Sequence, residues 1–257
     1  MKNKKVAILA LSMALVGALG LTACGGSKGN DAETQVFESE AAWAQAWADT
    51  LSQTNARILF TGVGESSEGE FFMKEEGVGD LRIADEQMHC AMSGYYSCNY
   101  EEEGEIVQKD ETPFTSDSYV YSEDGIAKEV YKENGEIVNI TTIGEFEFNV
   151  EHAFLYGLSS FPLEGVMEMY SMFTVEDGYY TFFAEEAGMS MEIKLQFADG
   201  KLSYAEMHQN GIDEWNGWTV VTDMTIEITY GGVTIGDVDV EEGEGSEIGD
   251  EKGSEIE

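Results

Sequence analysis

The sequence contains few of the residues on which enzyme and nucleic-acid chemistry depends. Its 257 residues include only 3 histidines, 3 cysteines and 2 prolines, and 13 lysines and arginines stand against 51 aspartates and glutamates. The resulting formal net charge of −38 argues against nucleic acid and anionic lipid surfaces as partners, because both would repel the chain.

Motifs that carry chemistry are absent from the sequence as well. His89, His152 and His208 show no zinc-type spacing with cysteine and no HExxH motif, so we expect no metal site. There is no P-loop, no dinucleotide fingerprint and no G-x-S-x-G elbow. We therefore expect no cofactor, no catalytic residues and no enzymatic activity.

The first 24 residues have the form of a secretory leader. Lysines within residues 2–5 form a basic head, and an apolar run covers Val6 to Leu21. This run is shorter than the roughly 20 residues that a spanning helix needs. Leu21-Thr22-Ala23-Cys24 resembles the lipobox of bacterial lipoproteins, and the alternative is an ordinary cleaved signal.

The lipobox resemblance implies how the protein is held in place. Residues 1–23 would be a lipoprotein signal peptide, and the thiol of Cys24 would be diacylglycerated and become the first residue of the mature protein. Two acyl chains are enough for stable anchoring. We expect a protein that meets the cell membrane through a lipid anchor on its extracytoplasmic face.

The rest of the chain divides into a tether, a domain and a tail. Residues 24–38 are rich in glycine and polar residues and predict a flexible tether. Residues 39–240 are enough for one domain with a sizeable core. Residues 241–257 are acidic and of low complexity, so we expect them to be disordered.

Two stretches show the spacing of an amphipathic helix. Ser39 can cap a helix whose Trp43, Trp47 and Leu51 share one face. In residues 149–161 four apolar residues recur on one face up to Pro162: Val150, Phe154, Leu158 and Phe161. Residues 163–173 are compatible with either a further helical turn or a loop.

From residue 57 onward most of the sequence alternates with the period of a β-strand. Asp124-Gly125 and Asn134-Gly135 are typical of tight hairpins, because these residues tolerate positive φ. The pattern predicts an antiparallel meander rather than a βαβ fold. We expect strands in residues 57–64, 69–74, 80–85, 87–100, 118–125, 127–135, 137–148, 177–188, 189–197, 202–211 and 219–235.

The pairing of Cys90 and Cys98 depends on the structure between them. A hairpin loop at residues 93–95 would place the two opposite each other, within reach of a disulfide. A continuous strand would keep the sulfurs too far apart. The unbroken alternation from Met88 to Tyr100 favours the strand and free thiols.

The order of these elements over residues 39–236 resembles the LolA- and LppX-type half-barrel lipoproteins. That resemblance implies an α+β, mostly β fold: a strongly curved antiparallel sheet (half-barrel) with helices covering its concave face. It also implies an apolar cavity between sheet and helices. The candidate ligand-lining residues are Phe154, Leu158, Phe161, Met191, Ile193, Leu195, Phe197, Ile226 and Ile228.

Two functions remain as hypotheses at this point. In the first, the anchored protein binds a lipid or other apolar ligand in that cavity. In the second, it is an acidic cell-surface interaction or sensing protein with a packed core and no small-molecule ligand. The sequence leaves the oligomeric state open.

Overall fold

The computed structural model describes residues 35–69, 71–102, 105–186, 188–212 and 218–236. The expected signal peptide, the lipidation site at Cys24 and the acidic tail therefore lie outside the described residues. So does the tether up to residue 34.

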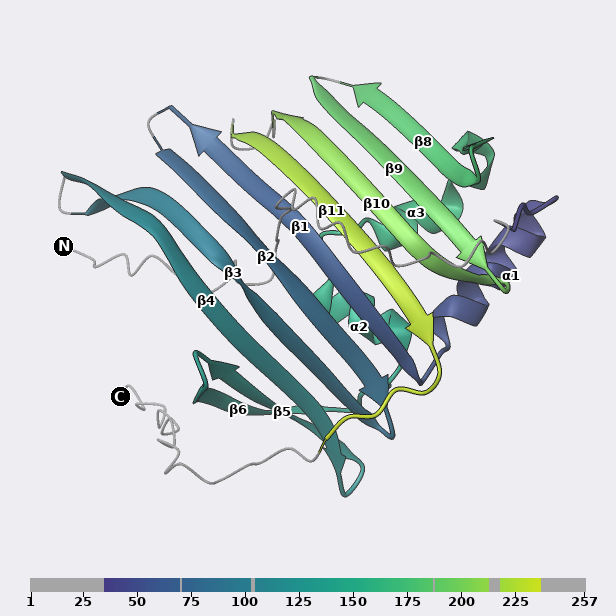
Figure 1. Cartoon of the computed structure of the whole chain (residues 1–257), viewed down its shortest axis with the longest axis horizontal. Coiled ribbons are helices and arrows are strands. Elements are labelled where there is room, and N and C mark those ends of the chain that lie inside the picture. Colours follow the sequence, from purple (N-terminus) through teal and green to yellow (C-terminus); the bar gives the residue numbers. More distant parts are fainter. Residues whose placement is uncertain (1–34, 70, 103–104, 187, 213–217, 237–257) are drawn as a thin grey trace, which may run out of the picture.

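Within these ranges the chain forms one antiparallel sheet of eleven strands in the order β6-β5-β4-β3-β2-β1-β11-β10-β9-β8-β7 (Figure 1). Two meanders build it, one running outward from β1 to β6 and the other returning from β7 to β11. The strands are β1 (Ala56–Glu68), β2 (Phe71–Ala84), β3 (Gln87–Glu102), β4 (Glu105–Glu123), β5 (Ile126–Glu133), β6 (Glu136–Gly144), β7 (Thr174–Glu176), β8 (Tyr179–Glu186), β9 (Met189–Ala198), β10 (Lys201–Ile212) and β11 (Thr219–Tyr230).

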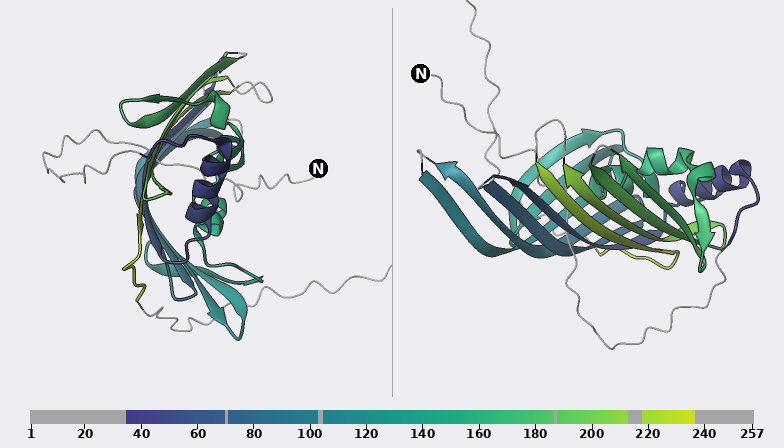
Figure 2. Two further views of the ribbon diagram at one scale, coloured as in Figure 1. Left: turned by 90° about the vertical axis from the view of Figure 1, so that its right-hand side faces the viewer. Right: turned by 90° about the horizontal axis from the view of Figure 1, so that it is seen from above.

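The sheet is curved and open, and the helices lie within its concavity (Figure 2). They are α1 (Glu40–Leu51), α2 (Val150–Gly157) and α3 (Leu163–Glu168), followed by a 3-10 turn, η2 (Tyr170–Met172). The expected fold class is confirmed: the chain is mostly β, with helices on the concave side of one curved antiparallel sheet.

Helix α1 begins where the sequence predicts it. The Ser39 hydroxyl accepts a hydrogen bond from the Ala42 amide at 3.2 Å, and Trp43 and Trp47 are fully buried. The Leu202 amide donates to Thr50 Oγ1 at 2.9 Å and ties α1 to β10. Two indole rings bury a large apolar area, and they pack here on the end of the sheet that carries Phe197.

Residues 35–38, expected to belong to the tether, pack on the domain. Phe37 is buried against Trp43 and Phe197. Its amide donates to the Tyr180 hydroxyl, and its carbonyl accepts from the Tyr170 hydroxyl at 2.8 Å. Residues 35–38 therefore belong to the domain, because one buried aromatic ring outweighs their polar composition.

Strand β2 corrects the expectation of two short strands separated by a turn near residues 75–79. Gly77 and Gly79 lie between the two expected strands, residues 69–74 and 80–85, and both fall inside one continuous strand. A Cβ on Gly77 would come within 2.2 Å of the Ser93 carbonyl oxygen, and one on Gly79 within 2.0 Å of the Phe60 ring. These glycines allow close packing rather than a turn.

A row of glycines crosses the central strands. Gly62 pairs with Gly77, and Gly77 pairs with Gly94 of β3. A Cβ on Gly94 would lie 2.0 Å from the Glu76 carbonyl oxygen. Such a row of glycines lets neighbouring backbones approach each other and lets the sheet curve. A flat sheet would not enclose a cavity.

Two further expectations about local structure are confirmed. Asp124, Gly125, Asn134 and Gly135 all have positive φ in the tight turns that flank β5. β3 runs unbroken from Gln87 to Glu102, and both Cys90 and Cys98 are free thiols.

Candidate functional site

One half of the concave face is filled. Strands β8 to β10 pack against α1 and Phe37, and Trp43 and Phe197 are in ring contact there at 5.2 Å between centroids. Ile193, Leu195 and Phe197 on β9 have no exposed surface. Large side chains from sheet and helix interdigitate on this side and leave a dry core.

The other half contains a cavity of about 350 Å³. Its wall is formed by β11, by β1 to β6, and by the end of α2 with the residues that follow it. The apolar part of the wall consists of Phe60, Leu81, Met88, Met92, Val120 and Met224. Its polar part, on β4 to β6, consists of Ser116, Ser118, Glu129, Tyr131 and Asn139. Thr61, Cys90, Val138, Tyr156, Gly157, Leu158 and Ser160 complete the lining.

The cavity exists because the side chains on this half are too short to reach the helix. Cys90, Ser116 and Ser118 occupy inward positions on β3 and β4, where β9 carries Ile193 and Leu195. Helix α2 also stops at Gly157, which packs so closely on Leu81 that a Cβ would come within 2.8 Å of its Cδ1.

A bulge in β6 changes the direction of one side chain. The pairing passes from Tyr131–Asn139 directly to Lys132–Ile137, so Val138 has no partner on β5. Consecutive strand residues normally point to opposite faces, whereas Val138 and Asn139 both line the cavity. A bulge is a common way to redirect a side chain toward a site.

The polar groups of the wall are partly paired with one another. Ser118 Oγ donates to Glu129 Oε1 at 2.7 Å, and Asn139 Nδ2 donates to Thr141 Oγ1 at 2.7 Å. Burial raises the pKa of the Cys90 thiol to about 12, with the charges of Asp117 and Asp80 as further causes. Cys90 is therefore a protonated, apolar part of the wall.

The ligand-lining residues expected from the sequence are mostly elsewhere. Only Leu158 lines this cavity. The other eight are core residues outside its lining: Phe154, Phe161, Met191, Ile193, Leu195, Phe197, Ile226 and Ile228. Met191 is partly buried and the rest are buried.

This correction has a physical reason. The apolar alternation of β9 is complete, and Phe197 at its end packs against Trp43 and Trp47 of α1. A cavity requires a shortage of side-chain volume, which strong apolar patterns do not indicate. The alternation of Met88, Cys90 and Met92 beside two inward serines was the signal in the sequence that could have located it.

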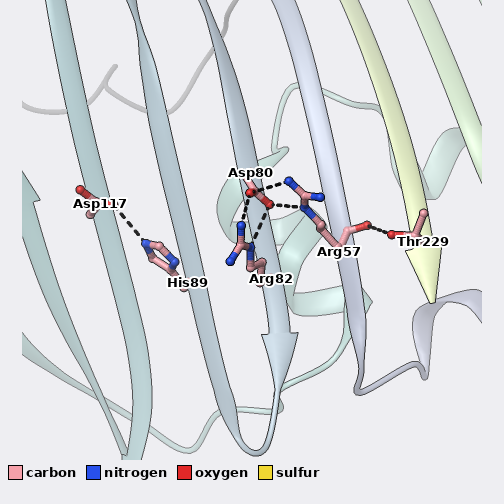
Figure 3. Close-up of polar contacts among 6 residues, drawn as sticks. All are labelled: Arg57, Asp80, Arg82, His89, Asp117 and Thr229. Atoms are coloured by element: carbon pink, nitrogen blue, oxygen red, sulfur yellow. Dashed lines mark hydrogen bonds and ion pairs between the residues drawn. The ribbon is translucent and has the colours of Figure 1, made fainter. Parts of the chain in front are cut away.

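The convex face carries a separate polar network (Figure 3). Arg57 donates to both Asp80 oxygens at 2.9 Å, and Arg82 Nη2 donates to Asp80 Oδ2 at 2.7 Å. The hydrogen bond from Arg57 is the main cause that lowers the pKa of Asp80 to about 2. His89 and Asp117 lie 3.0 Å apart on the same face. These residues alternate with cavity residues such as Leu81 and Cys90, so they point away from it.

In the part of the chain that the structure describes, no group of His, Cys, Asp and Glu side chains could hold a metal ion. None of the helices in the described ranges is long and apolar enough to cross a membrane.

No protein-family model and no curated protein matches the chain. Among solved structures, a beta-barrel-like protein of the domain of unknown function DUF1849 from Brucella abortus is similar over 70% of this chain and 99% of its own. The sequence identity is 10% and the TM-score is 0.28. A likeness this distant carries no argument about function.

Proposed function

We propose that this protein is a membrane-anchored, extracytoplasmic lipoprotein that binds a lipid or other apolar ligand between its sheet and α2. The observation that carries the proposal is the cavity of about 350 Å³ with its wall of Met, Phe, Leu and Val side chains. Ligand pockets in proteins are typically about 300–1,000 Å³ and mostly apolar.

The size of the cavity limits what it can hold. The cavity volume lies at the lower end of that range. The cavity therefore suits a single acyl chain or a compact apolar molecule better than a two-chain phospholipid. Met88, Met92 and Met224 add flexible, polarisable surface that adapts to an irregular ligand. The function is binding rather than catalysis.

The binding proposal is tested on a protein that begins at residue 24 and carries Cys24→Ser. The contacts of the folded domain that the structure describes begin at Gln35, so this protein keeps all of them. Native mass spectrometry of this protein should reveal a co-purified apolar molecule, or a fluorescent acyl probe should bind with one-to-one stoichiometry. If neither occurs, the acidic interaction protein with no small-molecule ligand becomes the better account.

The anchoring proposal rests on Leu21-Thr22-Ala23-Cys24 and needs its own experiment. Full-length protein expressed in bacteria should partition into the detergent phase of a cloud-point extraction. Cys24→Ser should move it to the aqueous phase or leave it unprocessed. Equal partitioning of the two proteins would contradict lipidation at Cys24.

A further inference from the structure

The described lining at the polar end of the cavity contains an acidic side chain and no basic one. Among the lining residues that the structure describes, Glu129 is the only acidic one, and none is Lys, Arg or His. The two lysines of β5 are engaged elsewhere: Lys128 pairs with Glu123, and Lys132 lies over the ring of Tyr119 on the convex face.

Among its described side chains, the polar end offers a carboxylate as an acceptor and no cationic donor. The Ser118 hydroxyl already donates to Glu129, and the Asn139 amide already donates to Thr141. Ser116 is hydrogen-bonded to the Tyr131 hydroxyl. What remains for a ligand is the rest of the Glu129 carboxylate and the Asn139 carbonyl oxygen, which accept hydrogen bonds, and the second N–H of the Asn139 amide, which donates.

Further carboxylates surround the same end. Burial raises the pKa of Tyr131, and the negative charges of Glu133, Glu129 and Glu75 raise it further. These three carboxyl groups come from β2 and β5 and act together on one phenol in the wall. The field at the polar end therefore attracts a cation and repels an anion.

The opposite end is apolar. Phe60 lies over Gly79, and Leu81, Met88, Met92 and Met224 continue the surface toward β11. A molecule that satisfies both ends has an apolar body and a positively charged head. An inorganic cation would meet only one carboxylate in the wall, and the described residues offer no ligand cluster for one.

We propose that the cavity selects cationic amphiphiles, with an amine or quaternary ammonium head against Glu129, Tyr131 and Asn139 and the chain against the apolar wall. This inference rests on the proposed binding function and names its ligand class. The Tyr131 ring contributes because aromatic faces attract alkylammonium groups in partly desolvated sites. A fatty-acid carboxylate would face Glu129 with no cation to pair with.

The experiment compares three ligands with the same ten-carbon chain: decyltrimethylammonium, decanol and decanoate. Each is titrated below its micellar concentration into the chain from residue 24 with Cys24→Ser, at pH 8 and 150 mM salt, where screening suppresses the general attraction of an acidic protein. We expect the cation to bind at least about tenfold more tightly than decanoate, with decanol between them.

The variant Glu129→Gln keeps the shape of the side chain and its ability to accept from Ser118. It should reduce the difference in affinity between the cation and decanoate to less than about threefold. The control Glu227→Gln removes the same charge from an exposed position on β11 and should preserve the difference. Thermal melts verify that both variants are folded.

The outcomes separate the two proposals. If none of the three ligands binds, the proposed binding function fails. If decanol binds but the cation and decanoate bind equally, or decanoate binds more tightly, the binding function stands and the selectivity is wrong. Selectivity that survives Glu129→Gln, or that is lost equally in Glu227→Gln, would also overturn the inference.

Discussion

At the scale of single residues, Glu75 is an acidic group whose charged form is disfavoured by burial. It points to the concave side from β2, opposite Tyr96, and burial raises its pKa from 4.5 to about 7. The folded protein therefore holds a proton that the unfolded chain releases above about pH 4.5. Ionisation costs stability between about pH 4.5 and 7, and the cost is constant above that window.

Glu75→Gln should remove this cost. We expect the variant to be more stable than the wild type by about 1–2 kcal/mol at pH 8 and nearly equal to it at pH 4.5. Urea denaturation at both pH values measures the difference. Glu76→Gln is the matched control, because Glu76 points to the other face and pairs with Lys74. A Glu75→Gln effect independent of pH would contradict the burial of its charge.

Cys90 provides a chemical probe of the cavity wall. Its raised pKa predicts that, in a Cys24→Ser and Cys98→Ser background, an aromatic disulfide reagent at pH 8 labels it at least about a hundredfold more slowly than an ordinary thiol with a pKa near 8.5. Denaturant should abolish the difference. Labelling at the rate of an unfolded thiol would show that Cys90 is not in the buried wall.

At the scale of elements, β2 illustrates how glycine shapes the site. Gly79 accommodates the Phe60 ring, and Phe60 forms part of the cavity wall. Gly165 of α3 provides the contrast, because a Cβ there meets nothing within 4 Å. The same substitution should therefore have opposite effects in the two elements.

Gly79→Ala should destabilise the protein by about 1–3 kcal/mol, because the new methyl group forces the Phe60 ring to move. It should also weaken binding of an acyl probe, because Phe60 forms part of the cavity wall. Gly165→Ala should stabilise α3 by about 0.5–1 kcal/mol and leave binding unchanged. Chemical denaturation and probe titration measure both quantities, and equal effects of the two changes would refute this account of β2.

At the scale of the whole molecule, the sheet has a filled half and a hollow half. Leu195 of β9 is fully buried in the core, whereas Cys90 faces the cavity. Leu195→Trp should overpack the core and cost about 1–3 kcal/mol, without a direct effect on the ligand site. Cys90→Phe should change stability by less than about 1 kcal/mol and abolish probe binding, because the added ring occupies space that was empty.

The two variants test the asymmetry together. If Leu195→Trp blocks the probe while Cys90→Phe does not, the ligand lies on the β9 side, where the sequence pattern first suggested it. If Cys90→Phe unfolds the protein, the space beside Cys90 is too small for an aromatic ring and the account of the hollow half is wrong.

Much of the architecture could be predicted from local pattern. Capping by Ser39, the helical spacing of Trp43 and Trp47, the hairpin turns at Asn134-Gly135 and the alternation along β3 each depend on interactions within a few residues. Such patterns predict elements and faces, and these predictions are confirmed by the structure. They were enough to predict an antiparallel meander with two amphipathic helices. The curvature of the sheet and the helices in its concavity were expected only from the resemblance to the half-barrel lipoproteins.

The position of the cavity could not be predicted in the same way. It depends on which helix reaches which strand, and so on contacts between residues far apart in sequence, such as Gly157 with Leu81 and Phe37 with Tyr180. The strongest apolar patterns mark where side chains fill space. Empty space arises where small inward residues, a bulge and a short helix coincide, and only the packed arrangement of the sheet brings those three together.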